Sequence, residues 1–184
     1  WHWAQADILA FEPSEDWPAD QKFRVIFDKN FFPRHVVMER LAYETRTPQF
    51  SAAIKELEIY QDPTNPTRRE ISATLELTHA VDPDELGRHV QLKMVGGSNI
   101  FPPNDPAPHF TTSYGLHRRL AYIHSSQILL PEHEDFLNLM VTKGLRTAQG
   151  GAQTRDAIEQ KLRIPSVASM FQVDSIQTAV ARNK

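Results

Sequence analysis

The sequence predicts an all-β protein built as an antiparallel β-sandwich of the immunoglobulin-like kind, and three observations lead to this prediction. Short runs of alternating apolar and polar residues recur along the chain, as in strands with one buried face. Thirteen prolines against seven glycines, with few helical periods, are typical of strands separated by turns. Finally, the same strand anchors recur in the same order about 111 to 117 residues apart, roughly the length of one sandwich of about 100 residues.

The strand from Glu70 to Thr78 is the clearest, and a second alternation follows from Val90 to Met94. Between them, Asp82 fits a helix N-cap, Pro83 fits the first helical position, and Gly87 fits a left-handed end, which predicts a single helical turn. Both strands are expected to face one core. The predicted buried residues of this sandwich are Ile71, Leu75, Leu77, Val90, Leu92, Leu137, Leu139 and Phe171.

The first 48 residues contain three predicted strands. One lies in 1–11 and precedes a solvated turn. The next carries Phe23, Val25 and Phe27 on one face, and Ile26 on the other face suggests that both faces are covered. After a loop at 28–36, a third strand is expected to carry Val37, Leu41 and Tyr43 on one face.

Beyond residue 48 the strands resume with Leu57 and Ile59 facing inward. An exposed loop without strand period is expected from residue 96 to 108, and further strands are expected around Leu120 and around Leu139. The segment 154–162 is compatible with two helical turns capped by Thr154 or with an irregular loop. A last strand is expected between Met170 and Ala179, with Phe171 and Val173 in phase.

The repeated anchors predict the domain organisation. Three pairs of segments match in the same order. These are Leu9-Ala10-Phe11 with Leu120-Ala121-Tyr122, Pro18 and Phe23 with Pro131 and Phe136, and Thr47-Pro48 with Ile164-Pro165. We therefore expect the C-terminal part of one sandwich domain in residues 1–48 and a complete sandwich domain in residues 49–184.

Composition limits the function. The formal net charge of −3, with basic and acidic residues intermixed, disfavours nucleic-acid binding. The lack of cysteine excludes disulfides, thiolate metal sites and cysteine nucleophiles within this sequence. No apolar run approaches the roughly 20 residues of a membrane helix, and a chain that starts at Trp1 rather than Met is expected to be cut from a longer protein.

No group of residues predicts catalysis, a cofactor or a metal. His117 and His124 lack ligand spacing, His133-Glu134 lacks a second histidine, and His124-Ser125 lacks a nucleophile elbow. Asp82, Asp84 and Glu85 fit a helix cap better than a calcium loop, and neither Gly96-Gly97 nor Gly150-Gly151 fits a phosphate loop. A carbohydrate site at Trp1, Trp3 and Trp17 is less expected than packing in a sandwich or at a domain junction. We predict no catalytic, cofactor-binding or metal residues and no enzyme activity.

Several of these segments resemble early macroglobulin-like domains of bacterial alpha-2-macroglobulins. In residues 1–48 the similar stretches run from Trp1 to Pro13, from Trp17 to Val25 and from Tyr43 to Pro48. The next stretch resembles the following domain. Its similar segments are Ala80-Val81-Asp82-Pro83-Asp84-Glu85-Leu86, Val90-Gln91-Leu92, Ile128-Leu129-Leu130-Pro131 and Lys143-Gly144-Leu145.

The resemblance implies a macroglobulin-like β-sandwich within a large periplasmic, often lipid-anchored cell-envelope protein that traps proteases. In that family a protease cuts a bait region and is enclosed, and many members also bind it through a thioester. Neither a thioester motif nor a recognisable bait segment is present in this sequence. The chain is then expected to be structural, with neighbouring macroglobulin-like domains as its partners and target proteases met only through the parent protein.

Two other readings stay open. The sequence also fits an immunoglobulin-like stalk or binding module of a bacterial surface protein, since such domains share the Val81-Asp82-Pro83 turn and the Leu130-Pro131 step. A carbohydrate-binding or hydrolytic accessory domain is the third reading.

Overall fold

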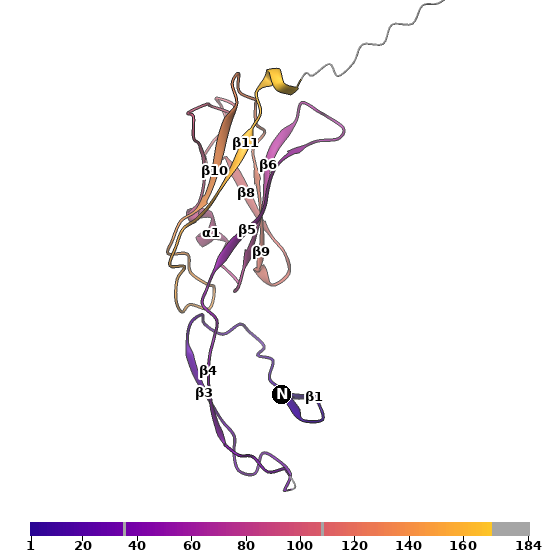
Figure 1. Cartoon of the computed structure of the whole chain (residues 1–184), viewed down its shortest axis with the longest axis vertical. Helices are drawn as coiled ribbons and strands as arrows, with labels where there is room; N and C mark the ends of the chain where they lie inside the picture. The colour runs from indigo at the N-terminus through magenta and orange to yellow at the C-terminus, as the bar shows by residue number, and fades with distance from the viewer. Residues whose placement is uncertain (35, 108, 171–184) are drawn as a thin grey trace, which may run out of the picture.

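A computed structural model describes residues 1–34, 36–107 and 109–170, and these residues form several antiparallel sheets with two short helical elements and one helix of seven residues. Figure 1 shows an elongated molecule, with a sandwich in its upper part and two hairpins in its lower part. We call the described residues up to 48 the N-terminal unit and those from 49 to 170 the sandwich. The predicted all-β sandwich is confirmed.

Two sheets make up the sandwich. The larger has the order β5-β6-β9-β8 and the smaller the order β11-β10-β7, with every neighbouring pair antiparallel. The strands of the larger sheet, in that order, are Ala52–Gln61, Arg69–Leu77, Leu120–Ser125 and Phe110–Tyr114. Those of the smaller sheet are Ile158–Ile164, Asp135–Val141 and Val90–Met94. The 3₁₀ elements are η1 (Leu116–Arg118) and η2 (Val167–Met170).

Strand β6 is the centre of the larger sheet because β5 and β9 flank it on both sides. Its alternation is confirmed, since Ile71, Ala73, Leu75 and Leu77 are all buried. The predicted helix is α1 (Pro83–His89), and the Asp82 carboxylate accepts a hydrogen bond from the Asp84 amide as an N-cap does. This helix carries the chain from one sheet to the other, so β6 and β7 face each other across the core.

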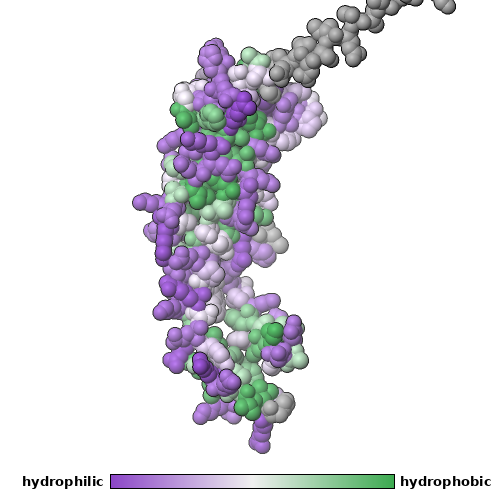
Figure 2. All heavy atoms as spheres, in the orientation of Figure 1, coloured by the Kyte–Doolittle hydropathy of each residue, from purple (hydrophilic) through white to green (hydrophobic). Residues whose placement is uncertain are grey.

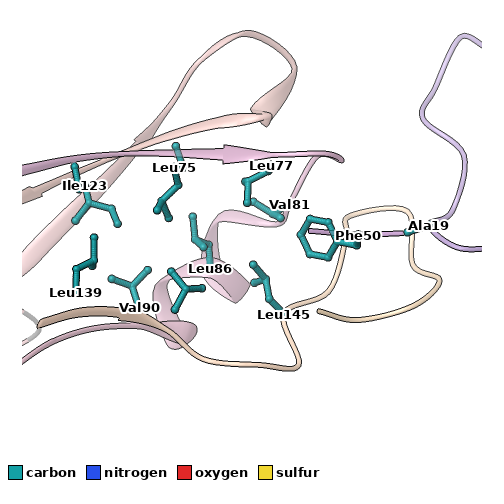
Figure 3. Close-up of a cluster of buried hydrophobic side chains, with 13 residues drawn as sticks. Ala19, Phe50, Leu75, Leu77, Val81, Leu86, Val90, Ile123, Leu139 and Leu145 are labelled. Carbon is teal, nitrogen blue, oxygen red and sulfur yellow. The ribbon is translucent and has the colours of Figure 1, made fainter. Parts of the chain in front are cut away.

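The core lies between the sheets in two clusters, and Figure 3 shows the one that runs towards the N-terminal unit. Leu86 of α1 points between Leu75 of one sheet and Val90 of the other. The other predicted core residues agree: Leu137 and Leu139 are buried, and Leu92 is half-buried. Phe171, like the predicted strand at 170–179 beyond Met170, lies outside the described residues.

The N-terminal unit consists of two antiparallel hairpins. Strand β1 (His2–Gln5) pairs with β2 (Ile8–Ala10), and β3 (Lys22–Ile26) pairs with β4 (Ala42–Arg46). In the sandwich, β8 pairs with β9 and β10 pairs with β11 in the same order. The recurrence therefore lies in the order of the hairpins, whereas the division of the chain into domains at residue 48 stays a prediction.

The repeat anchors themselves are out of phase. Leu120 is 37% exposed and Phe136 is 41% exposed, so both point away from the core, whereas Leu9 and Phe23 are half-buried. The buried apolar residue next to Phe136 in β10 is Leu137, one position further on. Because successive side chains of a strand point to opposite faces, a match that is shifted by one residue pairs a core-facing residue with an outward-facing one.

Three expectations in the N-terminal unit are wrong. Residues 1–11 form a hairpin that turns at Ala6 and Asp7, rather than one strand. Ile26 is 67% exposed, so only one face of β3 is covered, and Val37 is 90% exposed and lies before β4 rather than within it.

Four expectations in the sandwich also need correction. Gly87 lies inside α1 and does not end it. The loop at 96–108 is not exposed throughout, because Ile100 and Phe101 are buried, and β8 follows it at Phe110 although the sequence analysis expected no strand there. The segment 154–162 contains most of strand β11, while the Thr154 hydroxyl accepts a hydrogen bond from the Leu145 amide instead of capping a helix.

Candidate interdomain interface

The N-terminal unit and the sandwich meet around Ala19, which is fully buried. Its amide donates to the Gly150 carbonyl at 3.3 Å, and its carbonyl accepts from the Ala152 amide at 3.1 Å, which makes a short parallel bridge. Ala19 thereby joins the same apolar cluster as Phe50, and Figure 3 places it at the end of that cluster. Two segments about 130 residues apart in sequence are thus held by backbone hydrogen bonds and a shared core.

Gly151 is required at this contact for two reasons. Its φ of +94° belongs to the left-handed region, which favours glycine. In addition, a Cβ on Gly151 would lie 2.4 Å from the Ala19 carbonyl oxygen, whereas a Cβ on Gly150 would meet nothing within 4 Å. The sequence analysis singled out this glycine pair only to reject a phosphate loop, and the structure places it at the junction.

Ion pairs surround the bridge. An Arg119 nitrogen lies 2.6 Å from an Asp16 carboxylate oxygen. Asp20, whose side chain is 9% exposed, lies 2.8 Å from Arg46 within its own unit and 3.5 Å from Arg155 of the sandwich. Burial opposes ionisation of Asp16, but the hydrogen bond and charge of Arg119 outweigh it, so the pKa of Asp16 is lowered. Two loops of the sandwich at this junction therefore each place an arginine against an aspartate of the N-terminal unit.

His79 lies beside this ion pair with little exposure to solvent. Burial lowers its pKa; the Asp16 carboxylate opposes that effect and Arg119 reinforces it. The ring contacts the Thr78 hydroxyl at 3.1 Å and meets the Phe50 ring edge-on at 6.1 Å. A neutral, packed imidazole in this position is a structural part of the junction.

The second candidate is an aromatic cluster within the N-terminal unit. The Trp1 ring is tilted against those of Phe11 and Phe27, with centroids 4.7 and 5.4 Å away, and the Trp17 ring lies 4.2 Å from that of Phe23. A pocket of about 420 Å³ opens beside it. Its lining is Trp1, Trp3, Asp7, Leu9, Val25, Phe27, Phe32, Met38 and Tyr43. In Figure 2, hydrophobic residues reach the surface of this lower part of the molecule.

The histidines considered in the sequence do not assemble a site. His117 lies in η1, whereas His124 lies in β9, 3.4 Å from Glu70. The Ser125 hydroxyl accepts a hydrogen bond from the Ile71 amide and donates one to the Ser126 carbonyl, so this serine has a structural role in the sheet. Over the part of the chain that the structure describes, no three His, Asp or Glu side chains gather as a metal-binding group.

The remaining acidic and turn residues have structural partners. Asp82 caps α1, and Glu85 contacts Arg88 at 3.4 Å and His89 at 3.5 Å. Glu134, beside His133, is paired with Arg163. Gly96 packs against the Asp135 carboxylate, which its amide hydrogen-bonds at 2.7 Å.

Two bacterial proteins resemble this chain along most of its length. The alpha-2-macroglobulin of Pasteurella multocida (strain Pm70) is 27% identical over 175 residues, which cover 92% of the chain. An alpha-2-macroglobulin homolog of Yersinia pestis is 21% identical over 184 residues, which cover all of it. The chain is thus similar to bacterial alpha-2-macroglobulins over most of its own length. No protein-family model matches it.

The chain spans 9% of the length of each of these two relatives. Relatives of that length imply that the parent chain has several domains. Within residues 1–34, 36–107 and 109–170, none of the helices has the length and hydropathy that a membrane span requires.

The sequence analysis missed the junction residues Asp16, Ala19 and Arg119. The sequence does contain turn signals at Pro18 and at Gly150-Gly151. Nothing in it, however, indicates that these two distant loops contact each other. The expectation that Trp17 packs at a domain junction agrees with its place near Thr47 and Arg119, with which it lines a small cavity.

Proposed function

We propose that this chain is a structural segment of a bacterial alpha-2-macroglobulin-like inhibitor that traps proteases in the cell envelope. It would hold neighbouring macroglobulin-like domains in a fixed arrangement and have no catalytic activity of its own. Its partners are the adjoining domains of the parent chain, and target proteases are met only through the parent protein.

The observation that carries this proposal is the bridge between Ala19 and Gly150-Gly151. Backbone hydrogen bonds and a shared apolar cluster restrict rotation between the units far more than a flexible linker does. Such a connection suits a protein whose domains must move together when a protease is enclosed. The names of the two bacterial relatives favour this role over an immunoglobulin-like surface stalk.

The side chains support a structural role as well. Asp16, Asp82, Asp135 and Ser125 each stabilise a backbone segment or an ion pair, and so do not form a site with free nucleophiles or ligands. We therefore infer that the chain binds no cofactor or metal. A periplasmic location follows from the proposed role, because a trap for foreign proteases must meet them outside the cytoplasm.

Protease trapping is tested by comparing the parent protein with this chain alone. Each is incubated with a broad-specificity protease, and hydrolysis of a large protein substrate and of a short peptide is then measured. An enclosed protease is still reached by the peptide, so the parent should suppress protein hydrolysis much more than peptide hydrolysis. The 184-residue chain should suppress neither.

Inhibition by the chain alone, or equal suppression of both substrates by the parent, would contradict the proposal. The first result would place an inhibitory site within these residues, and the second would indicate a blocked active site rather than enclosure. Fractionation of cells that produce the parent protein tests the location, for which the expected compartment is the periplasm.

A further inference from the structure

His79 lies where the two units meet, just after the end of strand β6. It is 6% exposed, and its side chain lines a cavity of about 250 Å³ together with Thr78 and Arg119 of the sandwich. The opposite wall of this cavity belongs to the N-terminal unit. The residues of that wall are Pro13, Asp16, Trp17, Thr47 and Pro48. The N-terminal unit therefore limits the access of water to the His79 ring.

The His79 ring also contacts the segment that joins the units. The Thr78 hydroxyl, 3.1 Å from the ring, donates a hydrogen bond to the Gln49 carbonyl at 3.2 Å. Phe50, whose ring meets that of His79, belongs to the same buried cluster as Ala19, and Figure 3 shows these two residues next to each other. A change in the state of this imidazole is thus felt where the connection between the units is made.

Two charged groups face His79 across the junction. Asp16 lies in the loop between β2 and β3, Arg119 precedes β9, and the two form an ion pair at 2.6 Å. The adjoining cleft carries further ionisable side chains. These are Glu12, Glu15, His117 and Arg118. Since Arg119 already matches the Asp16 carboxylate, a proton on His79 would leave two cations to share one carboxylate.

Burial determines how His79 responds to acid. It lowers the pKa of His79 from the ordinary 6.5; Asp16 opposes this effect and Arg119 adds to it. Separation of the units would let water reach the imidazole and bring its pKa back towards 6.5, so the open junction binds the proton more readily than the closed one. The closed junction therefore keeps its full stability above about pH 6.5 and loses it as pH falls below that value. Asp16, whose pKa is lowered, stays ionised in this range.

We propose that His79 is a proton-sensitive switch of the junction: protonation of its imidazole favours separation of the N-terminal unit from the sandwich. The neutral ring packs against Phe50 and the cavity wall, whereas the imidazolium is solvated only when that wall moves away. The contact that opens is the bridge between Ala19 and Gly151. This inference concerns the junction itself and does not depend on protease trapping.

The charges around His79 favour a proton over a metal ion as its ligand. Arg119 would repel a divalent cation, and it occupies the carboxylate of Asp16. Among the residues that line the cavity, no second imidazole and no second carboxylate is present to complete a metal site. A proton needs no further ligand.

Hydrogen exchange across the junction tests the switch. The amides of Ala19 and Ala152 are followed in the 184-residue chain between about pH 7.5 and about pH 5.5, because both donate across the junction. Each rate is compared with that of an unfolded amide at the same pH, since exchange itself depends on pH. The resulting protection should fall several-fold towards the acid end, while that of the β6 amides should stay constant.

Two variants identify the group that titrates. His79→Gln keeps a polar side chain that does not ionise and should make the protection independent of pH. His117→Asn removes the exposed imidazole of the adjoining cleft at a φ of +62°, which asparagine tolerates, and should leave the pH dependence unchanged. Constant protection of β6 shows that the sandwich stays folded in both variants.

The coupling must also act in the reverse direction, since linkage is reciprocal. NMR titration of the His79 ring should give a pKa below 6.5 in the unsubstituted chain. In Gly151→Ala, whose added Cβ presses on Ala19, the pKa of His79 should rise towards 6.5. This measurement leaves His79 itself in place, so it holds even where His79→Gln fails to fold.

Several results would overturn the proposal. One is protection of Ala19 and Ala152 that does not change with pH in the unsubstituted chain. A second is a pH dependence that persists in His79→Gln or disappears in His117→Asn, which would assign the titration to another group. A third is an unchanged pKa of His79 in a Gly151→Ala chain whose Ala19 amide exchanges fast. A failure of protease inhibition by the parent would leave the inference untouched.

Discussion

Asp135 shows how a single side chain organises a turn of the sandwich. Its carboxylate accepts hydrogen bonds from the amides of Gly96, Ser98 and Phe136 at 2.7, 3.1 and 2.7 Å. The hydrogen bond with the Ser98 side chain is the largest cause, and together with the bonds from the backbone amides it lowers the pKa of Asp135 to about 2. The sequence alternation around Leu137 could be predicted, but this role could not, because the partner amides lie 37 and 39 residues away.

Asp135 should make the sandwich less stable in acid. Since the folded-state pKa lies below the ordinary value of 3.8, the stabilisation is fully present above about pH 4 and is lost as pH falls towards 2. Asp135→Asn should therefore lower the free energy of unfolding at pH 7, and its difference from the unsubstituted chain should shrink between pH 4 and pH 2. Urea unfolding across this range is the measurement, with Glu132→Gln, on the exposed neighbouring turn, as control. A difference that stays constant with pH would contradict the assignment.

At the scale of elements, local signals predicted β6, β7 and α1 well. Both signals are local: strict alternation marks strand β6, and the Asp82-Pro83 cap marks helix α1. The failure at 154–162 has a tertiary cause: Ile158 and Leu162 fit a helical period, but pairing with Val141 and Leu137 of β10 makes this segment a strand. Strand β8 was missed because the proline-rich loop before it obscured the short alternation of Phe110, Thr112 and Tyr114.

The loop that ends in Gly150-Gly151 should tolerate a side chain at one glycine and not at the other. Both residues have positive φ, so Gly150→Ala and Gly151→Ala share the cost of about 1–2 kcal/mol for a left-handed non-glycine residue. Only the second also forces a Cβ against Ala19. We expect Gly151→Ala to accelerate hydrogen exchange of the Ala19 and Ala152 amides, which cross the junction, without changing β6.

Gly150→Ala is the matched control and should leave the exchange of those two amides near that of the unsubstituted chain. Equal acceleration by both substitutions would mean that backbone strain alone weakens the junction, and the steric contact with Ala19 would then have no special role.

For the whole molecule, the sequence predicted the sandwich and a repeated order of strands, and it predicted no active site. It did not predict how the two units are joined, since the junction is made by backbone groups, a glycine and paired charges that leave no local pattern. The resemblance to bacterial alpha-2-macroglobulins, suggested by short motifs, is confirmed by the two relatives. We propose that these residues contribute to protease trapping by coupling neighbouring units.

The most direct test is the shielding of a protein substrate by the parent protein carrying Gly151→Ala or Gly150→Ala, after incubation with a broad-specificity protease. If coupling across the junction is required, the Gly151→Ala parent should still be cleaved by the protease but should shield the substrate less than the unsubstituted parent. The Gly150→Ala parent should shield it fully. Full shielding by the Gly151→Ala parent, with Ala19 and Ala152 exchanging fast in that same protein, would contradict the claim.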